Sequence, residues 1–100
     1  MNFDEVQLKS RFPEFSEAVP IHEYVARAQT GFYLPAMAIY KNDKGIVPGR
    51  IFALGSTPDS QGIRPLVDID GEVQDISRTL HGLPLCVLVN RRPVTEPNPP

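Results

Sequence analysis

The stretch from Leu83 to Val89 reads LPLCVLV and is the longest apolar run in the chain. Its residues are apolar on both alternating sides, whereas a strand with one face in water alternates apolar and polar residues. Such a strand is covered on both faces and lies in the interior of its sheet. The run is also far too short to span a bilayer, which takes about 20 residues in a helix. The sequence therefore predicts a sheet covered on both sides, in a protein with no membrane partner.

Two segments upstream have the patterns of short helices, which can cover one face of a small sheet. Residues Asn2 to Arg11 place acidic side chains in the first turn and basic ones in the last, as the helix dipole favours, and Pro13 ends this helix. Pro20 suits the first position of a second helix, and Gly31 suits its end. The apolar stripe of that second helix has i, i+3, i+4, i+7 spacing and consists of Ile21, Tyr24, Val25 and Ala28.

Strand-forming segments separated by turn residues follow from position 32 onward. Pro35 in the first of them indicates an edge strand or a bulge, because proline cannot donate a ladder hydrogen bond. Lys41 to Gly45 has turn composition, and a Pro48-Gly49 break is expected before the next strand. The three strands expected in this region are Phe32–Tyr40, Arg50–Ser56 and Arg64–Ile69, and the last of them runs into the acidic segment.

The acidic segment VDIDGEVQDI, residues 67–76, is interpreted as a turn with solvated carboxylates. In a calcium-binding loop that used Gly71 as its glycine, the first and twelfth ligand positions would be Leu66 and Ser77, and neither supplies a carboxylate. Asp-Gly is a strong hairpin signal. A three-residue loop ending in Gly71 would oppose Val67 with Val73, and we favour that register over the two-residue turn, which opposes Val67 with Gln74.

The sequence of residues 72–81 fits two alternative structures, a strand followed by a short helix or one continuous helix. Val73, Ile76 and Leu80 would form the buried stripe of the continuous helix. In the first alternative a short helix begins near Ser77 and ends at His81, where an imidazolium favours the helix dipole. Both alternatives leave the acidic side chains facing water.

The predicted fold class is α+β, with two short N-terminal helices followed by a mainly antiparallel sheet of four or five strands. Closure of that sheet into a curled roll or partial barrel is an alternative. Residues 1–90 are expected to form a single domain, and residues 91–100, with four prolines, a mobile tail. A net charge of −2 disfavours a general nucleic-acid binder. A single cysteine implies no disulfide, so a cytoplasmic protein is the default.

The functional prediction is a small non-enzymatic module that binds or regulates another protein, or a subunit of a larger assembly. No catalytic, metal-binding or cofactor-binding residue is predicted. A homodimer is expected, because both faces of two strands are apolar and a chain of 100 residues has little material to cover a second face. The candidate interaction or pocket residues are Tyr40, Arg50, Phe52, Arg64, Asp68, Asp70 and His81.

The alternative is a small enzyme or ligand-binding domain. It would use the acidic turn from Asp68 to Asp75 together with His81 and Cys86. A nucleophilic cysteine needs a helix N-terminus or an adjacent base to lower its pKa. An interior strand offers neither, so Cys86 is predicted to be a buried structural residue.

Overall fold

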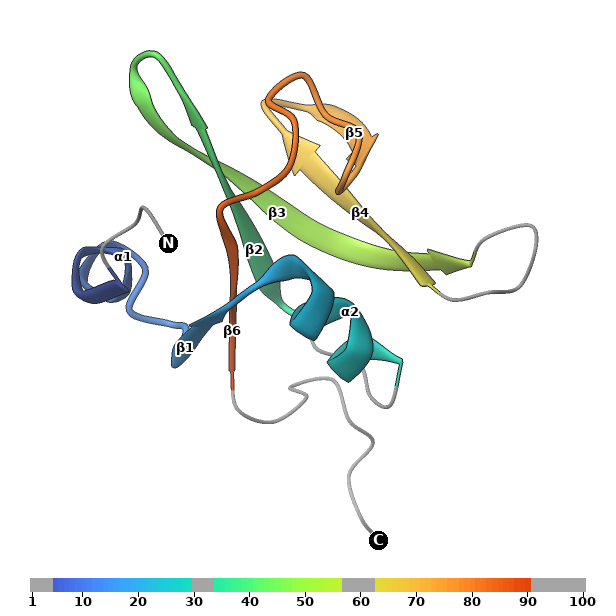
Figure 1. Cartoon of the computed structure of the whole chain (residues 1–100), viewed down its shortest axis with the longest axis horizontal. Coiled ribbons are helices and arrows are strands. Elements are labelled where there is room, and N and C mark those ends of the chain that lie inside the picture. The colour runs from blue at the N-terminus through green and yellow to red at the C-terminus, as the bar shows by residue number, and fades with distance from the viewer. Residues whose placement is uncertain (1–4, 30–33, 57–62, 91–100) are drawn as a thin grey trace, which may run out of the picture.

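The computed structural model describes residues 5–29, 34–56 and 63–90, and Figure 1 shows its arrangement. The loop expected at 57–62, the tail at 91–100, Gly31 and the beginning of the first helix lie outside the described residues. The described part is α+β, with two helices and six strands. They are α1 (Glu5–Arg11), β1 (Glu17–Val19), α2 (Ile21–Ala28), β2 (Ala36–Asn42), β3 (Gly45–Ser56), β4 (Ile63–Ile69), β5 (Glu72–Asp75) and β6 (Cys86–Val89).

All six strands join one antiparallel sheet in the order β1-β6-β2-β3-β4-β5. The expectation of four or five strands was therefore too low, because the short strand β1 between the two helices also joins the sheet. β1 and β5 form its two edges and do not pair with each other, so the sheet is not closed into a barrel. In Figure 1 the β4–β5 hairpin lies on the far side of the long β2–β3 hairpin from β1 and α1.

The strand predicted between Leu83 and Val89 is shorter in the structure, where β6 begins at Cys86 and Leu83 is 63% exposed, but its interior position is confirmed. It pairs with β1 on one side and β2 on the other, and its four residues are all buried. Val87 and Val89 face one layer, whereas Cys86 and Leu88 face the other. Both sides of β6 are therefore covered by protein, as its unbroken apolar sequence indicates.

Helix α2 covers one face of the sheet, which we call the α2 face. Pro20 precedes the helix in an extended conformation, and the predicted stripe points inward, with Tyr24 and Ala28 buried. These side chains pack in a cluster with alternate residues of the central strands, including Ala38, Val67 and Val87.

Helix α1 and the turn after it cover part of the opposite face, which we call the α1 face. Leu8 and Phe15 are buried there against Ile39, Cys86 and Leu88, which belong to β2 and β6. No described residue of β4 or β5 belongs to this cluster. The cover on this face therefore stops near the middle of the sheet.

The β2–β3 hairpin corrects two expectations about proline. Pro35 indicated an edge strand or a bulge, but β2 begins one residue later and lies in the interior between β6 and β3. β3 also continues through Pro48-Gly49 without the expected break. At Gly49 a Cβ atom would come within 3.0 Å of Ile69 Cγ1 and 3.1 Å of Tyr40 Cε1. Glycine is therefore present at this point because two neighbouring side chains approach the backbone closely.

The turn between β4 and β5 has a register different from the one we favoured. Ile69 pairs with Glu72 and Val67 with Gln74, so the hairpin has a two-residue loop. Asp70 and Gly71 have φ values of 53° and 86°, the left-handed pair that a type I′ turn requires. The preference for pairing Val67 with Val73 was wrong because β5 is a short edge strand on which Val73 remains 59% exposed.

Residues 76–85 form neither of the predicted helices. After β5 the chain makes turns, with a bridge between Thr79 and Gly82. The turns are held by Ser77 N–H to Asp75 Oδ1 (2.9 Å) and Leu80 N–H to Gln74 Oε1 (3.1 Å). Side-chain acceptors thus satisfy backbone donors locally, which favours turns over a helix here.

Within the described ranges, neither α1 nor α2 has the length and apolar character that a membrane-spanning helix needs.

Candidate interaction surface

The part of the α1 face that α1 leaves uncovered lies on β3, β4 and β5. Charged and apolar side chains share it. We call this area the open sheet surface and define it by Arg50, Phe52, Ala53, Leu66, Asp68 and Val73.

A β-bulge on β3 shapes the middle of this surface. The register shifts between Ile51 and Ala53, so that Phe52 is an extra residue with no partner on β4. Ile51 and Leu54 pack into the core of the α2 face. Phe52 therefore turns to the other side, where 43% of it is exposed. A bulge of this kind re-aims a side chain, and here it presents an aromatic ring to solvent.

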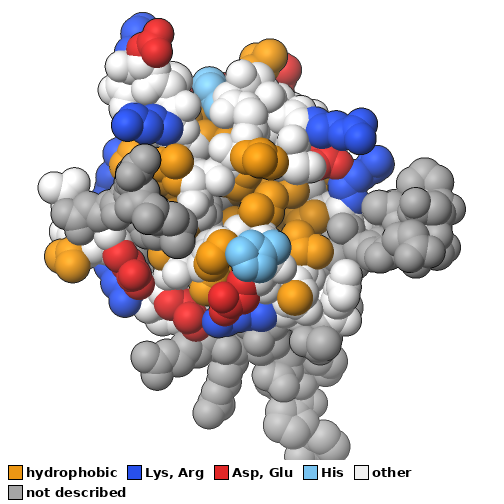
Figure 2. All heavy atoms as spheres, in the orientation of Figure 1, with side chains coloured by type: hydrophobic (Ala, Val, Ile, Leu, Met, Phe, Trp, Pro, Cys, Tyr) orange, Lys and Arg blue, Asp and Glu red, His pale blue; other side chains and the backbone are white. Residues whose placement is uncertain are grey.

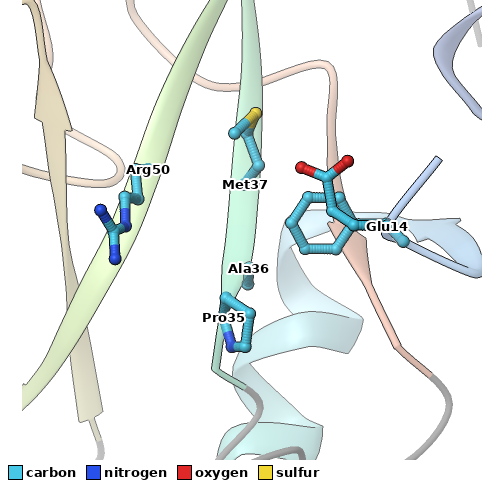
Figure 3. Close-up of a pocket in the computed structure, with 6 residues that line it drawn as sticks. Glu14, Pro35, Ala36, Met37 and Arg50 are labelled. Carbon is cyan, nitrogen blue, oxygen red and sulfur yellow. The ribbon is translucent and has the colours of Figure 1, made fainter. Parts of the chain in front are cut away.

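A hollow of about 310 Å³ lies where the open sheet surface meets the cover formed by α1. Figure 3 shows Arg50 on β3 and Glu14 on opposite sides of β2, with Pro35, Ala36 and Met37 between them. Phe15 completes the lining. The hollow is mainly apolar, with a cation on one side and an anion on the other.

Ion pairing holds one border of the open sheet surface. Arg64 Nε lies 3.3 Å from Asp75 Oδ2, and the Asp75 side chain is only 17% exposed. The expectation that every acid of the segment is solvated was therefore wrong for Asp75. It is confirmed for Asp68, Asp70 and Glu72, which are exposed.

The predicted site residues do not all meet. Arg50, Phe52 and Asp68 lie on the open sheet surface, and Arg64 is at its border. Asp70 occupies the turn beyond it. Tyr40 and His81 lie on the α2 face instead.

Tyr40, one of the candidate interaction or pocket residues, is fully buried in the core of the α2 face. Its hydroxyl donates a hydrogen bond to the carbonyl oxygen of Ile76 at 2.7 Å. Burial, and to a smaller extent the negative charge of Asp75, raise the pKa of Tyr40. The ring centroid of His81 lies 6.2 Å from that of Tyr40, at an interplanar angle of 43°. His81 therefore packs beside a core tyrosine in a turn, not at the end of a helix.

The groups of the alternative enzymatic site do not converge. Cys86 packs on the α1 face under α1, whereas the ring neighbour of His81, Tyr40, belongs to the cluster of the α2 face. Asp68 binds the Gly71 N–H through Oδ1 at 2.8 Å in the exposed β4–β5 turn. The described residues contain no group of three or more His, Cys, Asp or Glu side chains placed to hold a metal ion.

Cys86 has the environment of a structural cysteine. It is free and buried, and burial, with a smaller contribution from the Glu5 carboxylate, raises the pKa of its thiol to about 11. A raised pKa disfavours the thiolate, which is the reactive form.

We expect Cys86 to react with a thiol reagent near pH 8 at least about a hundredfold more slowly in the native protein than in denaturant, because the pKa shift alone lowers the thiolate fraction by that order. Its contribution to stability is fully present below the unfolded-state pKa of about 8.5 and is lost as pH rises towards 11. Native labelling as fast as that of the denatured chain would contradict this assignment. In Cys86→Ala, the alkaline loss should begin at higher pH than in the parent protein.

Sequence reasoning missed Leu66 and Val73 as surface residues. It also missed the lining of the hollow at Glu14, Phe15, Pro35 and Met37. Alternation along β4 gave a usable signal, since Leu66 and Asp68 share the side opposite the buried Val67. The hollow had no such signal, because it forms where segments distant in sequence meet.

Figure 2 shows the opposite side of the molecule, the face on which α2 lies, where hydrophobic side chains gather in the middle and charged ones towards the margins.

Comparisons with protein-family models, curated proteins and solved structures found no match to this chain.

Proposed function

We propose that this chain is a non-enzymatic protein-binding module whose binding site is the open sheet surface together with the adjoining hollow. One observation carries the proposal: the cover on the α1 face ends near the middle of the sheet, leaving Phe52 and Val73 exposed on β3 and β5. Exposed apolar side chains within a polar border are typical of protein interaction sites.

The composition of the surface supports a protein partner more than a nucleic acid. Aromatic and arginine side chains are enriched in protein interfaces, and Phe52 and Arg50 lie two residues apart on one strand. The acidic group of Asp68 lies within this area, and those of Asp75 and Glu14 lie beside it. Their negative charge would oppose a phosphate backbone. A cytoplasmic location is part of the proposal and rests on the single, buried cysteine.

A photo-cross-linking experiment tests the site. A benzophenone amino acid is placed at position 52 of the full chain, and the protein is irradiated in the cells from which it comes. We expect discrete adducts whose mass exceeds the 11.1 kDa of the chain and whose partner is identified by peptide mass spectrometry.

The control places the same group at position 22. His22 is exposed on α2, on the other face of the sheet, and should give no discrete adduct. Equal adducts at both positions, or none at position 52, would refute the open sheet surface as the binding site.

A further inference from the structure

One row of residues across four strands has a palindromic chemical pattern. The sheet register places Met37 beside Arg50, Arg50 beside Asp68, and Asp68 beside Val73. From β2 to β5 this row reads apolar, cation, anion, apolar. Read from β5 to β2, the apolar ends are unchanged and the two charges exchange places. A second copy of the same row, turned around, is therefore complementary to the first at every position.

We propose that the open sheet surface binds a second copy of this chain, face to face, about a two-fold axis that runs parallel to the strands midway between β3 and β4. This inference rests on the proposed function and names its partner. The axis places β3 of one copy over β4 of the other. Arg50 then faces the partner subunit's Asp68, and Asp68 faces the partner subunit's Arg50.

The apolar positions also match under this rotation. Leu66 pairs with Ala53 in the sheet, so the axis brings Leu66 over the partner subunit's Ala53, next to Phe52. At the ends of the row, Val73 comes to lie over the partner subunit's Met37. Met37 lines the hollow of about 310 Å³, and Val73 is 59% exposed, so an exposed side chain meets a hollow that can receive it.

Helix α1 stands above the sheet next to the open sheet surface, and this difference in height, a step in the surface, fits the arrangement. A helix is about 10 Å across, and packed sheets lie about 10 Å apart, so α1 occupies the layer that the partner's sheet fills over the open half. The rotation brings the partner's edge strand β5 alongside α1. The step then limits how far one copy can slide across the other, which fixes the register of the row.

The charges of the row favour the proposed rotation over its alternatives. Arg50 forms no ion pair among the described residues, and Asp68 uses Oδ1 for the turn at Gly71. In the dimer, two arginines and two aspartates alternate, so every charge has opposite charges as its nearest neighbours. A sheet shifted by one strand would place Arg50 over the partner subunit's Arg50, and like charges in contact cost several kcal/mol.

Charge reversal tests the proposal by sedimentation equilibrium of the full chain. A patch four strands wide is small for a protein interface, so we expect reversible dimerisation with a dissociation constant in roughly the micromolar range. Arg50→Asp gives a row with two anions, and Asp68→Arg gives a row with two cations. Each variant alone should dimerise at least about tenfold more weakly, because like charges then face each other across the axis.

Two combinations then distinguish pairing between chains from damage within a chain. An equimolar mixture of Arg50→Asp and Asp68→Arg should associate again as a heterodimer, because anions face cations across the axis. The double variant in one chain should also dimerise. Lys44→Asp, an exposed change in the β2–β3 turn, is the control and should leave the dissociation constant unchanged.

Three results would overturn the dimer. They are a single 11.1 kDa species at all concentrations up to about 1 mM, dimerisation insensitive to either single reversal, and a mixture that stays monomeric. If the chain is monomeric but cross-links to another protein at position 52, the dimer is wrong and the protein-binding module stands. If neither dimer nor adduct forms, both proposals fail.

Discussion

Leu88→Ala is expected to lower the free energy of unfolding by about 2–5 kcal/mol. Leu88 lies in the central strand β6, fully buried in the cluster that holds α1 on the sheet. Its sheet neighbours are Ala18 and Met37. Removing its three outer carbons leaves a cavity between helix and sheet, and strands paired on both sides cannot move far enough to fill it.

A urea titration followed by circular dichroism measures this change, and Leu80→Ala is the matched control. Leu80 is 82% exposed in the turns after β5, so the same loss of three carbons should change the free energy by no more than about 0.5 kcal/mol. Similar effects for the two variants would show that β6 is not covered on both faces.

The position of Leu88 is the part of the fold that the sequence predicts best. An apolar run without alternation has one economical solution, a strand with protein on both faces. The placement of the two helices on opposite faces was not predicted, because both were expected to cover the same face. The helix stripe that includes Tyr24 and Ala28 points inward as its spacing requires. These are local patterns tied directly to burial, and so they can be recognised without knowing which strands pair.

Register and turn geometry were less predictable, because two local preferences competed. Between Val67 and Gln74 the apolar pattern favoured one loop length, whereas Asp70-Gly71 favoured another. The turn chemistry prevailed because two residues with positive φ fit a type I′ loop, and an edge strand loses little by exposing Val73. The helix expected to end at His81 failed for a related reason: side chains of Asp75 and Gln74 bind the backbone of the turns.

The candidate surface was only partly visible in the sequence. Arg50, Phe52 and Asp68 were among the predicted residues, but they were grouped with Tyr40, which is buried on the other face. Met37 and Val73 were missed, although they complete the row across the sheet. Which strands α1 leaves uncovered depends on the packing of Leu8 in one cluster with Ile39 and Leu88, and a single sequence carries no local signal for such long-range packing.

Tyr40→Phe is expected to lower the free energy of unfolding by about 1–3 kcal/mol at neutral pH. The change removes one hydroxyl, which donates to the carbonyl oxygen of Ile76 at 2.7 Å within the core. Ile76 is itself buried, so its carbonyl would lose this bond in a place that solvent does not readily reach. The bond joins the sheet to the turns after β5, and those turns should exchange their amide hydrogens faster in the variant.

Ser77→Ala is the control, because it also deletes one hydroxyl bond, that of Ser77 Oγ to Asp75 Oδ1 at 2.9 Å, but in an exposed turn. Water can replace this bond, so the free energy of unfolding should change by no more than about 0.5 kcal/mol.

Alkaline titration gives a second readout of the Tyr40 hydroxyl. Burial raises the pKa of Tyr40 in the folded state, so its contribution is complete below the unfolded-state pKa of about 10 and is lost as pH rises above it. Tyr40→Phe should therefore show a shallower loss of stability above pH 10 than the parent protein, and an unchanged slope would place the Tyr40 hydroxyl in contact with solvent.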